Sequence, residues 1–272
     1  MPRRALVLPP VCLLCTVAAG AISLISVNDE IAIGREAQRQ ISSETPQVRD
    51  RHVVSYVEQV GRQLAARAEG PRYPYSFEVA NYREVNAFAL PGGPVWVHRG
   101  AIQIAQTEAQ LAGVLAHEVA HIAQRHAADQ LTKSIATNFG LGLLGALLGN
   151  SGGASAAQIA ARFAAGGAFL KFSRDDEREA DRVGAQIMHR AGWDARGMLE
   201  FMQVLNQQAG RGTSGVENFF STHPSPANRM GLLREHVGSL RGGRRDSAAF
   251  REIKARLRRM PPAPSMRRTE SR

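Results

Sequence analysis

The chain has 272 residues and a mass of 29.5 kDa, and 44% of its residues are hydrophobic, as in an ordinary globular protein. This composition excludes a collagen, a coiled coil and a wholly disordered chain. The formal net charge is +10, and the segment from Arg229 to the end holds 13 Lys and Arg against 4 Asp and Glu. Because the chain has no zinc-finger pairs of cysteines and no aromatic-rich binding segment, we expect no nucleic-acid partner; anionic lipid heads suit the basic end at least as well.

Residues 1–27 have the pattern of a targeting segment outside the fold. Arg3 and Arg4 precede an uncharged stretch that continues to Val27, and small residues at positions 18–21 offer signal-peptidase sites. We predict a cleaved signal peptide, with an uncleaved N-terminal anchor as the alternative. Both cysteines of the chain fall in this segment, which leaves a lipoprotein signal open and predicts a mature domain without a disulfide.

The next part of the chain combines helices with one small sheet. Apolar residues at helical spacing predict amphipathic helices at Asp29–Ser43 and Arg51–Ala68. Alternating and β-rich segments predict an antiparallel sheet of hairpin type, with strands at Tyr75–Tyr82, Ala87–Leu90 and Val95–Val97 around a Pro-Gly-Gly turn. Helical spacing returns from Thr107 to Asp129 with a long apolar stripe.

Residues Gly140–Gly167 are rich in Gly, Ala and Leu and allow two interpretations. They form either a mobile insertion, such as a lid or a loop that touches a membrane, or an ordinary seam of small residues between packed helices. Further helices are predicted at Phe172–Ala191, with Ser173 as its N-cap, and at Asp194–Gln208, Pro224–Leu240 and Ser247–Met260. Residues 261–272 are predicted to be a disordered basic tail. The fold class is therefore α+β and mostly helical.

The helix from Thr107 to Asp129 carries the chemistry. His117, Glu118 and His121 form an H-E-x-x-H motif, which places both imidazoles on one helical face, where they can bind one zinc ion. Glu118 lies one position further round the helix, close enough to receive a proton from a water at the metal. A solvated helix with two chance histidines is the alternative, but the helix is apolar on both sides of the motif, so unligated histidines would be buried without partners.

A catalytic zinc site needs a third protein ligand. The extended metzincin pattern is excluded because its third histidine position holds Ala127; His126 is one residue out of register and is interpreted as a surface histidine or one that supports a ligand from behind. Glu177 and Asp181 share one face of the predicted helix Phe172–Ala191. Glu177 can ligate the metal while Asp181 orients a ligating histidine, although a charged helix surface is the other interpretation.

Five segments together resemble the gluzincin family of the CAAX prenyl protease type, and most closely its soluble BepA-like and Oma-like branch without tetratricopeptide repeats. The segments occur in the family's order over about residues 31–240, and they are EIAIGREAQRQI, NAFALPGGPVWVHRGAI, HEVAHIAQRH, SRDDEREADRVG and STHPSPANRM. The resemblance implies a zincin-like helical domain with a small sheet, here residues 28–260. It also implies that Glu177 is the third zinc ligand.

The resemblance carries over further residues. His223 and Arg229 match a family pair near the open face of the zinc, where they could stabilise an oxyanion. His223 could instead be a fourth zinc ligand, or merely cap the following helix. Asn86 and the strand Pro94–His98, including Val95 and Val97, match the family's substrate-facing edge, where an extended peptide could add as a strand. A hairpin that only completes the core is the alternative.

These residues predict a zinc endopeptidase with one Zn²⁺ per chain. Glu118 takes a proton from water and returns it to the leaving amine. The family implies extended or misfolded polypeptides as substrates and a role in protein quality control of the cell envelope. A latent protease that acts mainly as a holdase or assembly chaperone is the competing function.

The predicted location is the bacterial periplasm. Contact with a membrane surface is open at the N-terminal segment, the Gly140–Gly167 insertion or the basic C-terminus.

Overall fold

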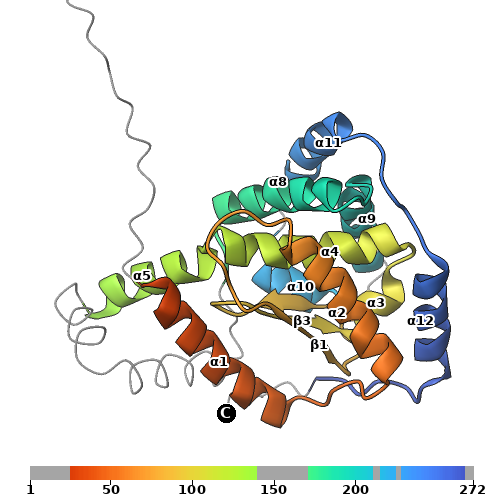
Figure 1. Cartoon of the computed structure of the whole chain (residues 1–272), viewed down its shortest axis with the longest axis horizontal. Helices are drawn as coiled ribbons and strands as arrows, with labels where there is room; N and C mark the ends of the chain where they lie inside the picture. Colours follow the sequence, from red (N-terminus) through yellow and green to blue (C-terminus); the bar gives the residue numbers. More distant parts are fainter. Residues whose placement is uncertain (1–24, 140–170, 211–214, 225–227, 267–272) are drawn as a thin grey trace, which may run out of the picture.

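The computed structural model describes residues 25–139, 171–210, 215–224 and 228–266 (Figure 1). The predicted Gly140–Gly167 insertion, residues 1–24 of the predicted targeting segment and residues 267–272 of the predicted tail lie outside the described residues. The strands are β1 (Ser76–Ala80), β2 (Ala87–Ala89) and β3 (Pro94–His98), and the helices are α1 (Val27–Glu44), α2 (Arg51–Ala65), α3 (Arg99–Ile104), α4 (Glu108–Ala123), α5 (His126–Phe139), α8 (Arg174–Arg190), α9 (Arg196–Gly210), α10 (Glu217–Thr222), α11 (Arg229–Ser239) and α12 (Ala248–Arg259).

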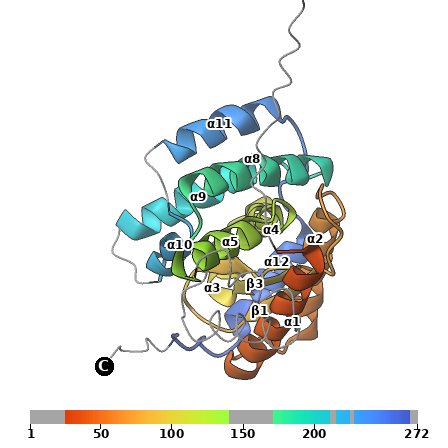
Figure 2. The same cartoon turned by 90° about the vertical axis from the view of Figure 1, so that its left-hand side faces the viewer.

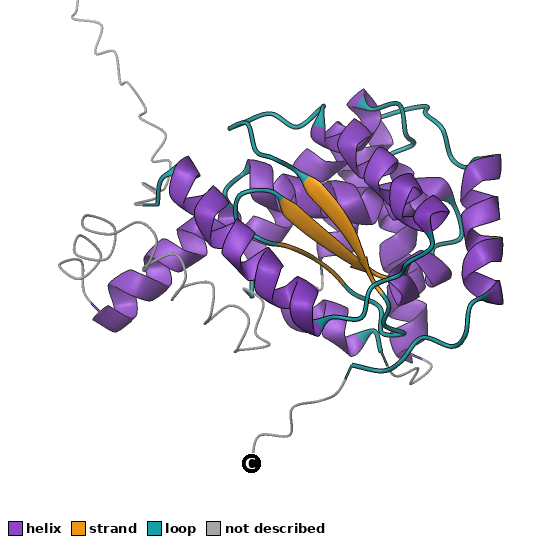
Figure 3. Ribbon diagram, turned by 60° about the horizontal axis from the view of Figure 1, so that its bottom comes forward, coloured by secondary structure: helices purple, strands orange, loops and turns teal. Residues whose placement is uncertain are grey.

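The sheet is small, mixed and enclosed by helices (Figure 3). Its strand order is β1-β3-β2, so β3 is the central strand. β2 and β3 form the expected antiparallel hairpin, whereas β1 pairs with β3 in parallel. The mostly helical α+β class is confirmed, but the wholly antiparallel sheet is corrected, because alternation along a strand predicts its two faces and does not predict which strands become neighbours.

Helix α4 lies at the centre of a layered arrangement. Both views show α11, α8, α4, the sheet and α1 in succession (Figures 1 and 2). Every residue of α4 is buried, because α2, α8, α9 and the sheet all pack against it. A helix surrounded in this way needs apolar or small residues on all sides, which explains its sequence, EAQLAGVLAHEVAHIA. The H-E-x-x-H motif therefore lies inside the core.

The predicted helix Thr107–Asp129 is two helices. α4 ends at Ala123, and α5 begins at His126. Between them Arg125 has φ of 61°, in the left-handed region that a non-glycine residue rarely adopts. Its guanidinium donates to the buried carboxylate of Glu30 at 2.6 Å, and Tyr73 donates to the other oxygen of that carboxylate at 3.0 Å. Long-range pairing thus supports a break that local helical spacing did not reveal.

Helices α1, α2, α8, α9 and α12 overlap their predicted ranges, whereas the short helix α3 was not predicted and the segment before α11 differs. Ser173 caps α8 as predicted, since its hydroxyl accepts a hydrogen bond from the Asp176 N–H in a capping box. The predicted helix Pro224–Leu240 begins only at Arg229, and the short helix α10 precedes it. None of the described helices is both long and apolar enough to span a bilayer.

Both ends of the described chain are more ordered than the sequence predicts. Ile25 is part of a buried core cluster, and Val27 starts α1, so residues 25–27 pack with the domain. Near the other end, Arg99 donates to the Pro261 carbonyl at 2.8 Å, and Glu84 accepts from the Met266 N–H at 3.0 Å. These contacts place residues 261–266 on the domain surface, which corrects their assignment to a disordered tail.

Close backbone approach fixes α4 against α9. A Cβ on Gly113 would lie 2.7 Å from Met198 Cα, and a Cβ on Gly197 would lie 2.4 Å from the Ala109 carbonyl. Neither distance is compatible with a side chain unless the helices separate. The two glycines therefore set how near α9 lies to the helix that carries the motif.

We expect Gly197→Ala to destabilise the protein by about 1–3 kcal/mol, because the added methyl group must push α9 away from α4. The melting temperature should fall by about 2–4 °C per kcal/mol for a chain of this size. Gly231→Ala is the matched control, since a Cβ there meets nothing within 4 Å on helix α11. Equal melting temperatures for the two variants would contradict the proposed helix contact.

Candidate metal centre

Helix α4 presents His117 and His121 one turn apart, as the motif predicts. Their Nε2 atoms lie 3.0 Å from each other, and the side chains are almost fully buried. The helix thus directs two imidazole nitrogens to one point inside the protein.

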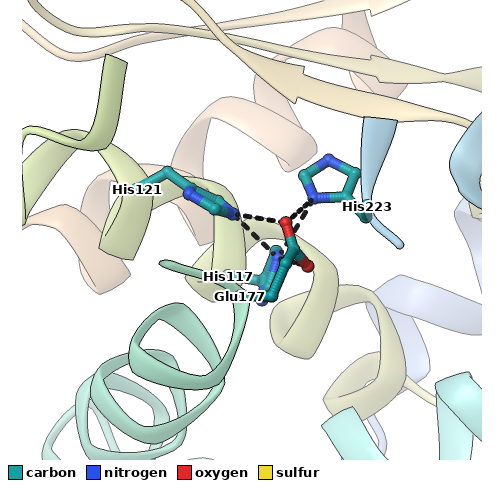
Figure 4. A group of neighbouring side chains, drawn as sticks. All are labelled: His117, His121, Glu177 and His223. Atoms are coloured by element: carbon teal, nitrogen blue, oxygen red, sulfur yellow. Dashed lines mark hydrogen bonds and ion pairs between the residues drawn. The ribbon is translucent and has the colours of Figure 1, made fainter. Parts of the chain in front are cut away.

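Helix α8 brings a carboxylate to the same point (Figure 4). Glu177 lies in its first turn, which the Ser173 cap begins beside α4. Glu177 Oε2 lies 3.4 Å from His117 Nε2, and Glu177 Oε1 lies 3.4 Å from His121 Nε2. Burial alone would raise the pKa of Glu177, but the charge and hydrogen bonds of the surrounding histidines hold it well below its usual value.

His223, the residue that follows α10, completes the group. Its Nδ1 lies 2.9 Å from Glu177 Oε1 and 3.3 Å from His117 Nε2. One donor atom from each of the four side chains lies within 4.8 Å of the others. Tetrahedral zinc with ligands at about 2.0–2.1 Å requires ligand atoms about 3.3 Å apart. The contacts of 2.9–3.4 Å among these atoms are close to this value, and the widest separation stays within 4.8 Å, so the four side chains have the spacing of a metal site.

Asp181 lies one turn after Glu177 and contacts the other nitrogen of the His117 ring. Its Oδ1 is 3.1 Å from His117 Nδ1, the arrangement that directs Nε2 toward a metal. Burial lowers the pKa of His117, but hydrogen bonds to Asp181 and Glu177 raise it to about 9. The predicted orienting contact of Asp181 is thus present in the geometry.

Arg229 is buried and contacts the two carboxylates of α8. Its Nε and Nη2 donate to the two Asp181 oxygens at 2.6 and 2.8 Å, and its Nη1 lies 2.6 Å from Glu177 Oε2. In this structure the guanidinium of Arg229 is therefore engaged by Asp181 and Glu177, and its expected oxyanion contact stays a prediction. The sequence placed Arg229 near the metal but did not specify its partners.

Glu118 is fully buried beside this group. Among the described residues, neither of its carboxylate oxygens accepts a hydrogen bond, and His223 Nε2 lies 3.4 Å from Oε1. Burial raises the pKa of Glu118 above its ordinary value, although the His223 charge acts against this shift. A buried carboxyl group without a hydrogen-bond partner and with a raised pKa is suited to accept a proton.

Two further aromatic rings surround His121. Phe172 stacks on it with ring centroids 3.8 Å apart, and His126 Nδ1 lies 2.9 Å from His121 Nδ1. The sequence offered no signal for Phe172 beyond its place at a helix start. His126 is buried and contacts a candidate ligand directly, so of its two interpretations the supporting one agrees with the structure.

Two of the predicted substrate-facing residues lie on the central strand and not on an edge strand. Val95 and Val97 belong to β3, which pairs on both sides, and both side chains are buried in the core. Because the backbone of β3 is already hydrogen-bonded to β1 and β2, it cannot receive an added strand, and this expectation is corrected. Asn86 directly precedes β2, and its side-chain oxygen accepts from the Ala87 N–H at 3.0 Å.

Comparisons with known proteins agree with this centre. Residues 52–237 match the model of peptidase family M48. A beta-barrel assembly-enhancing protease of Yersinia pestis is 31% identical over 86% of this chain and 49% of its own length. The corresponding protease of Escherichia coli (strain K12) is 32% identical over 80% of this chain and 46% of its own length.

A mitochondrial metalloendopeptidase OMA1 of Schizosaccharomyces pombe is 30% identical over 84% of this chain and 67% of its own length. The chain spans about half the length of the beta-barrel assembly-enhancing proteases that it matches. The family match covers both histidines of the motif, Glu177 and His223. The chain therefore belongs to peptidase family M48.

Proposed function

We propose that the protein is a zinc-dependent endopeptidase. The observation that carries this proposal is the buried set His117, His121, Glu177 and His223, with the carboxylate of Glu118 beside it, which has no hydrogen-bond partner among the described residues. A zinc ion held by these side chains would polarise the scissile carbonyl and acidify water. Glu118 then takes the proton of the attacking water and delivers it to the leaving amine. This proton transfer requires no second buried base.

The remaining polar residues of the centre hold these groups in place. Asp181 fixes the His117 ring through Nδ1, and Arg229 bridges Asp181 to Glu177. His223 Nδ1 lies with the other donor atoms, so we propose that it is the fourth ligand in this conformation. Stabilisation of the oxyanion by His223 is the alternative, and it requires the ring to leave Glu177 Oε1.

We propose β2 as the edge that binds the substrate backbone. Leu90 N–H donates to Pro94 O at 2.8 Å and His98 N–H donates to Asn86 O at 2.9 Å, so residues 86, 88 and 90 face β3. Ala87 and Ala89 therefore turn their backbone groups to the outer edge, and α4 packs against this strand. A peptide that adds here is extended, which favours unfolded or misfolded polypeptides as substrates.

We further propose an exported protein that acts on such chains in the cell envelope as part of protein quality control. The similarity to beta-barrel assembly-enhancing proteases supports this location, as do Arg3 and Arg4 with the uncharged stretch that follows them. Contact with a membrane surface through the N-terminal segment, the Gly140–Gly167 insertion or the basic C-terminus belongs to the same proposal. A holdase that binds these chains without cutting them is the competing function, and the intact Glu118 speaks against it.

We expect Glu118→Gln to lower kcat on an unfolded protein such as casein by about 10²–10⁴-fold, because the amide cannot accept the water proton. Zinc content, measured in parallel, should equal that of the parent protein. Normal turnover by the variant would contradict the mechanism. Binding of casein without cleavage by the zinc-loaded parent would favour the holdase.

Zinc should stabilise the protein because the four donor atoms converge only in the folded state. At a free zinc concentration 1,000 times its Kd, the expected gain is about 4 kcal/mol, or roughly 8–16 °C in melting temperature. The measurement is thermal unfolding after chelation and again after zinc is returned. A double variant, His117→Ala with His121→Ala, should show no such shift, and a parent protein that does not respond contradicts the metal site.

Ala89→Pro tests the proposed binding edge, because proline removes the outward N–H and is tolerated on edge strands. Loss of one hydrogen bond of about 1 kcal/mol should raise KM for casein by roughly fivefold. Ala89→Ser keeps the N–H and should leave KM unchanged. If the two variants have the same KM, the substrate does not pair with this strand.

A further inference from the structure

His121 has two ring nitrogens, and only one of them faces the other candidate ligands. Its Nε2 lies toward His117 and Glu177 (Figure 4). Its Nδ1 lies 2.9 Å from Nδ1 of His126, which is 2% exposed. His126 Nε2 in turn lies 3.4 Å from Glu179 Oε2. A chain of polar contacts thus runs from the centre of the site through two imidazoles to a carboxylate.

This order of contacts selects one set of proton positions. The Glu179 oxygen accepts, so His126 donates from Nε2 and presents a lone pair at Nδ1. His121 must then donate from its own Nδ1, which leaves the lone pair on its Nε2. That lone pair points at the site where a metal would bind. If His126 donated to His121 instead, the proton of His121 would lie on Nε2, and that nitrogen could not bind a metal.

The break between α4 and α5 is what brings His126 to this position. In a continuous helix, a residue five positions after His121 would lie about 140° round the axis from it, on another face. Arg125, in its left-handed conformation, ends α4 and turns the chain so that His126 meets the His121 ring. The pairing of Arg125 with the buried Glu30 stabilises that turn.

Phe172 stacks on the His121 ring. His121 is therefore confined by an aromatic contact on its face and by a single polar contact at its outer nitrogen. Among the described residues, His126 is the only hydrogen-bond partner of that nitrogen.

We propose that His126 is a positioning residue, which fixes the tautomer and orientation of His121 for metal binding, with Glu179 fixing His126 in the same way. The inference rests on the metal site of the proposed function. Asp181 orients the His117 ring, and His126 with Glu179 orients the His121 ring in the same way.

The test compares His126→Leu with His126→Asn. The two new side chains have similar shapes, but the oxygen of the asparagine amide can occupy the place of Nδ1 and accept from His121. Zinc affinity is measured by competition with a chromophoric chelator, and the visible spectrum of the Co²⁺ form reports the geometry of the ligands. We expect the leucine variant to bind zinc about 10–100-fold more weakly, with an altered Co²⁺ spectrum, and the asparagine variant to remain close to the parent.

The outcomes separate this inference from the proposed function. A parent protein that binds neither Zn²⁺ nor Co²⁺ overturns the metal site itself. A parent that binds tightly, together with a leucine variant of equal affinity and spectrum, overturns the role of His126 alone. Equal weakening in the leucine and asparagine variants also overturns it, because packing and not the hydrogen bond would then be the cause.

A second variant keeps the test decisive if His126→Leu does not fold, which circular dichroism will show. Glu179 is 43% exposed in its side chain, so Glu179→Ala should fold. We expect it to weaken zinc binding several-fold, because His126 loses the acceptor that selects its tautomer. Arg178→Ala, at the neighbouring exposed residue, is the matched control and should bind as the parent does. Equal affinity in Glu179→Ala and Arg178→Ala contradicts the proposed chain of contacts.

Discussion

Buried negative charge is the constraint on which this structure depends. Glu118, Glu177 and Asp181 are all excluded from solvent, and the described residues place one permanently charged cation, Arg229, among them. Unpaired carboxylates in a protein interior cost several kcal/mol each. A divalent cation between the histidines would add positive charge beside these carboxylates. The charge balance of the core and its proposed chemistry therefore have the same requirement.

The scaffold meets this requirement by packing helices very closely around α4. Gly113 and Gly197 allow α9 to approach from one side, and Gly184 of α8 lies so near that a Cβ would be 3.1 Å from the Ala116 carbonyl, one residue before His117. Such contacts leave little freedom for either helix to slide. Glu177 is therefore held against the two histidines by backbone packing as well as by its charge.

Sequence reasoning succeeded where the information is local. Helical geometry alone predicts that His117 and His121 share one face of a helix, and that Glu177 and Asp181 share one face of another. The Ser173 cap could also be predicted from the sequence. It failed where distant residues decide the outcome. The central place of β3 depends on a parallel partner earlier in the chain, and the break at Arg125 depends on Glu30, far away in sequence. The two carboxylate partners of Arg229 are likewise known only from the fold.

The charge balance also explains why a histidine and not a carboxylate contacts Nδ1 of His121. Asp181, the partner of His117, is already neutralised by Arg229. A further buried carboxylate beside His121 would add negative charge without a matching cation. An imidazole avoids this, because His126 in turn contacts Glu179, whose side chain is 43% exposed and pairs with Arg182. The carboxylate that selects the tautomer thus lies at the surface, and an imidazole ring instead of a carboxylate occupies the interior position.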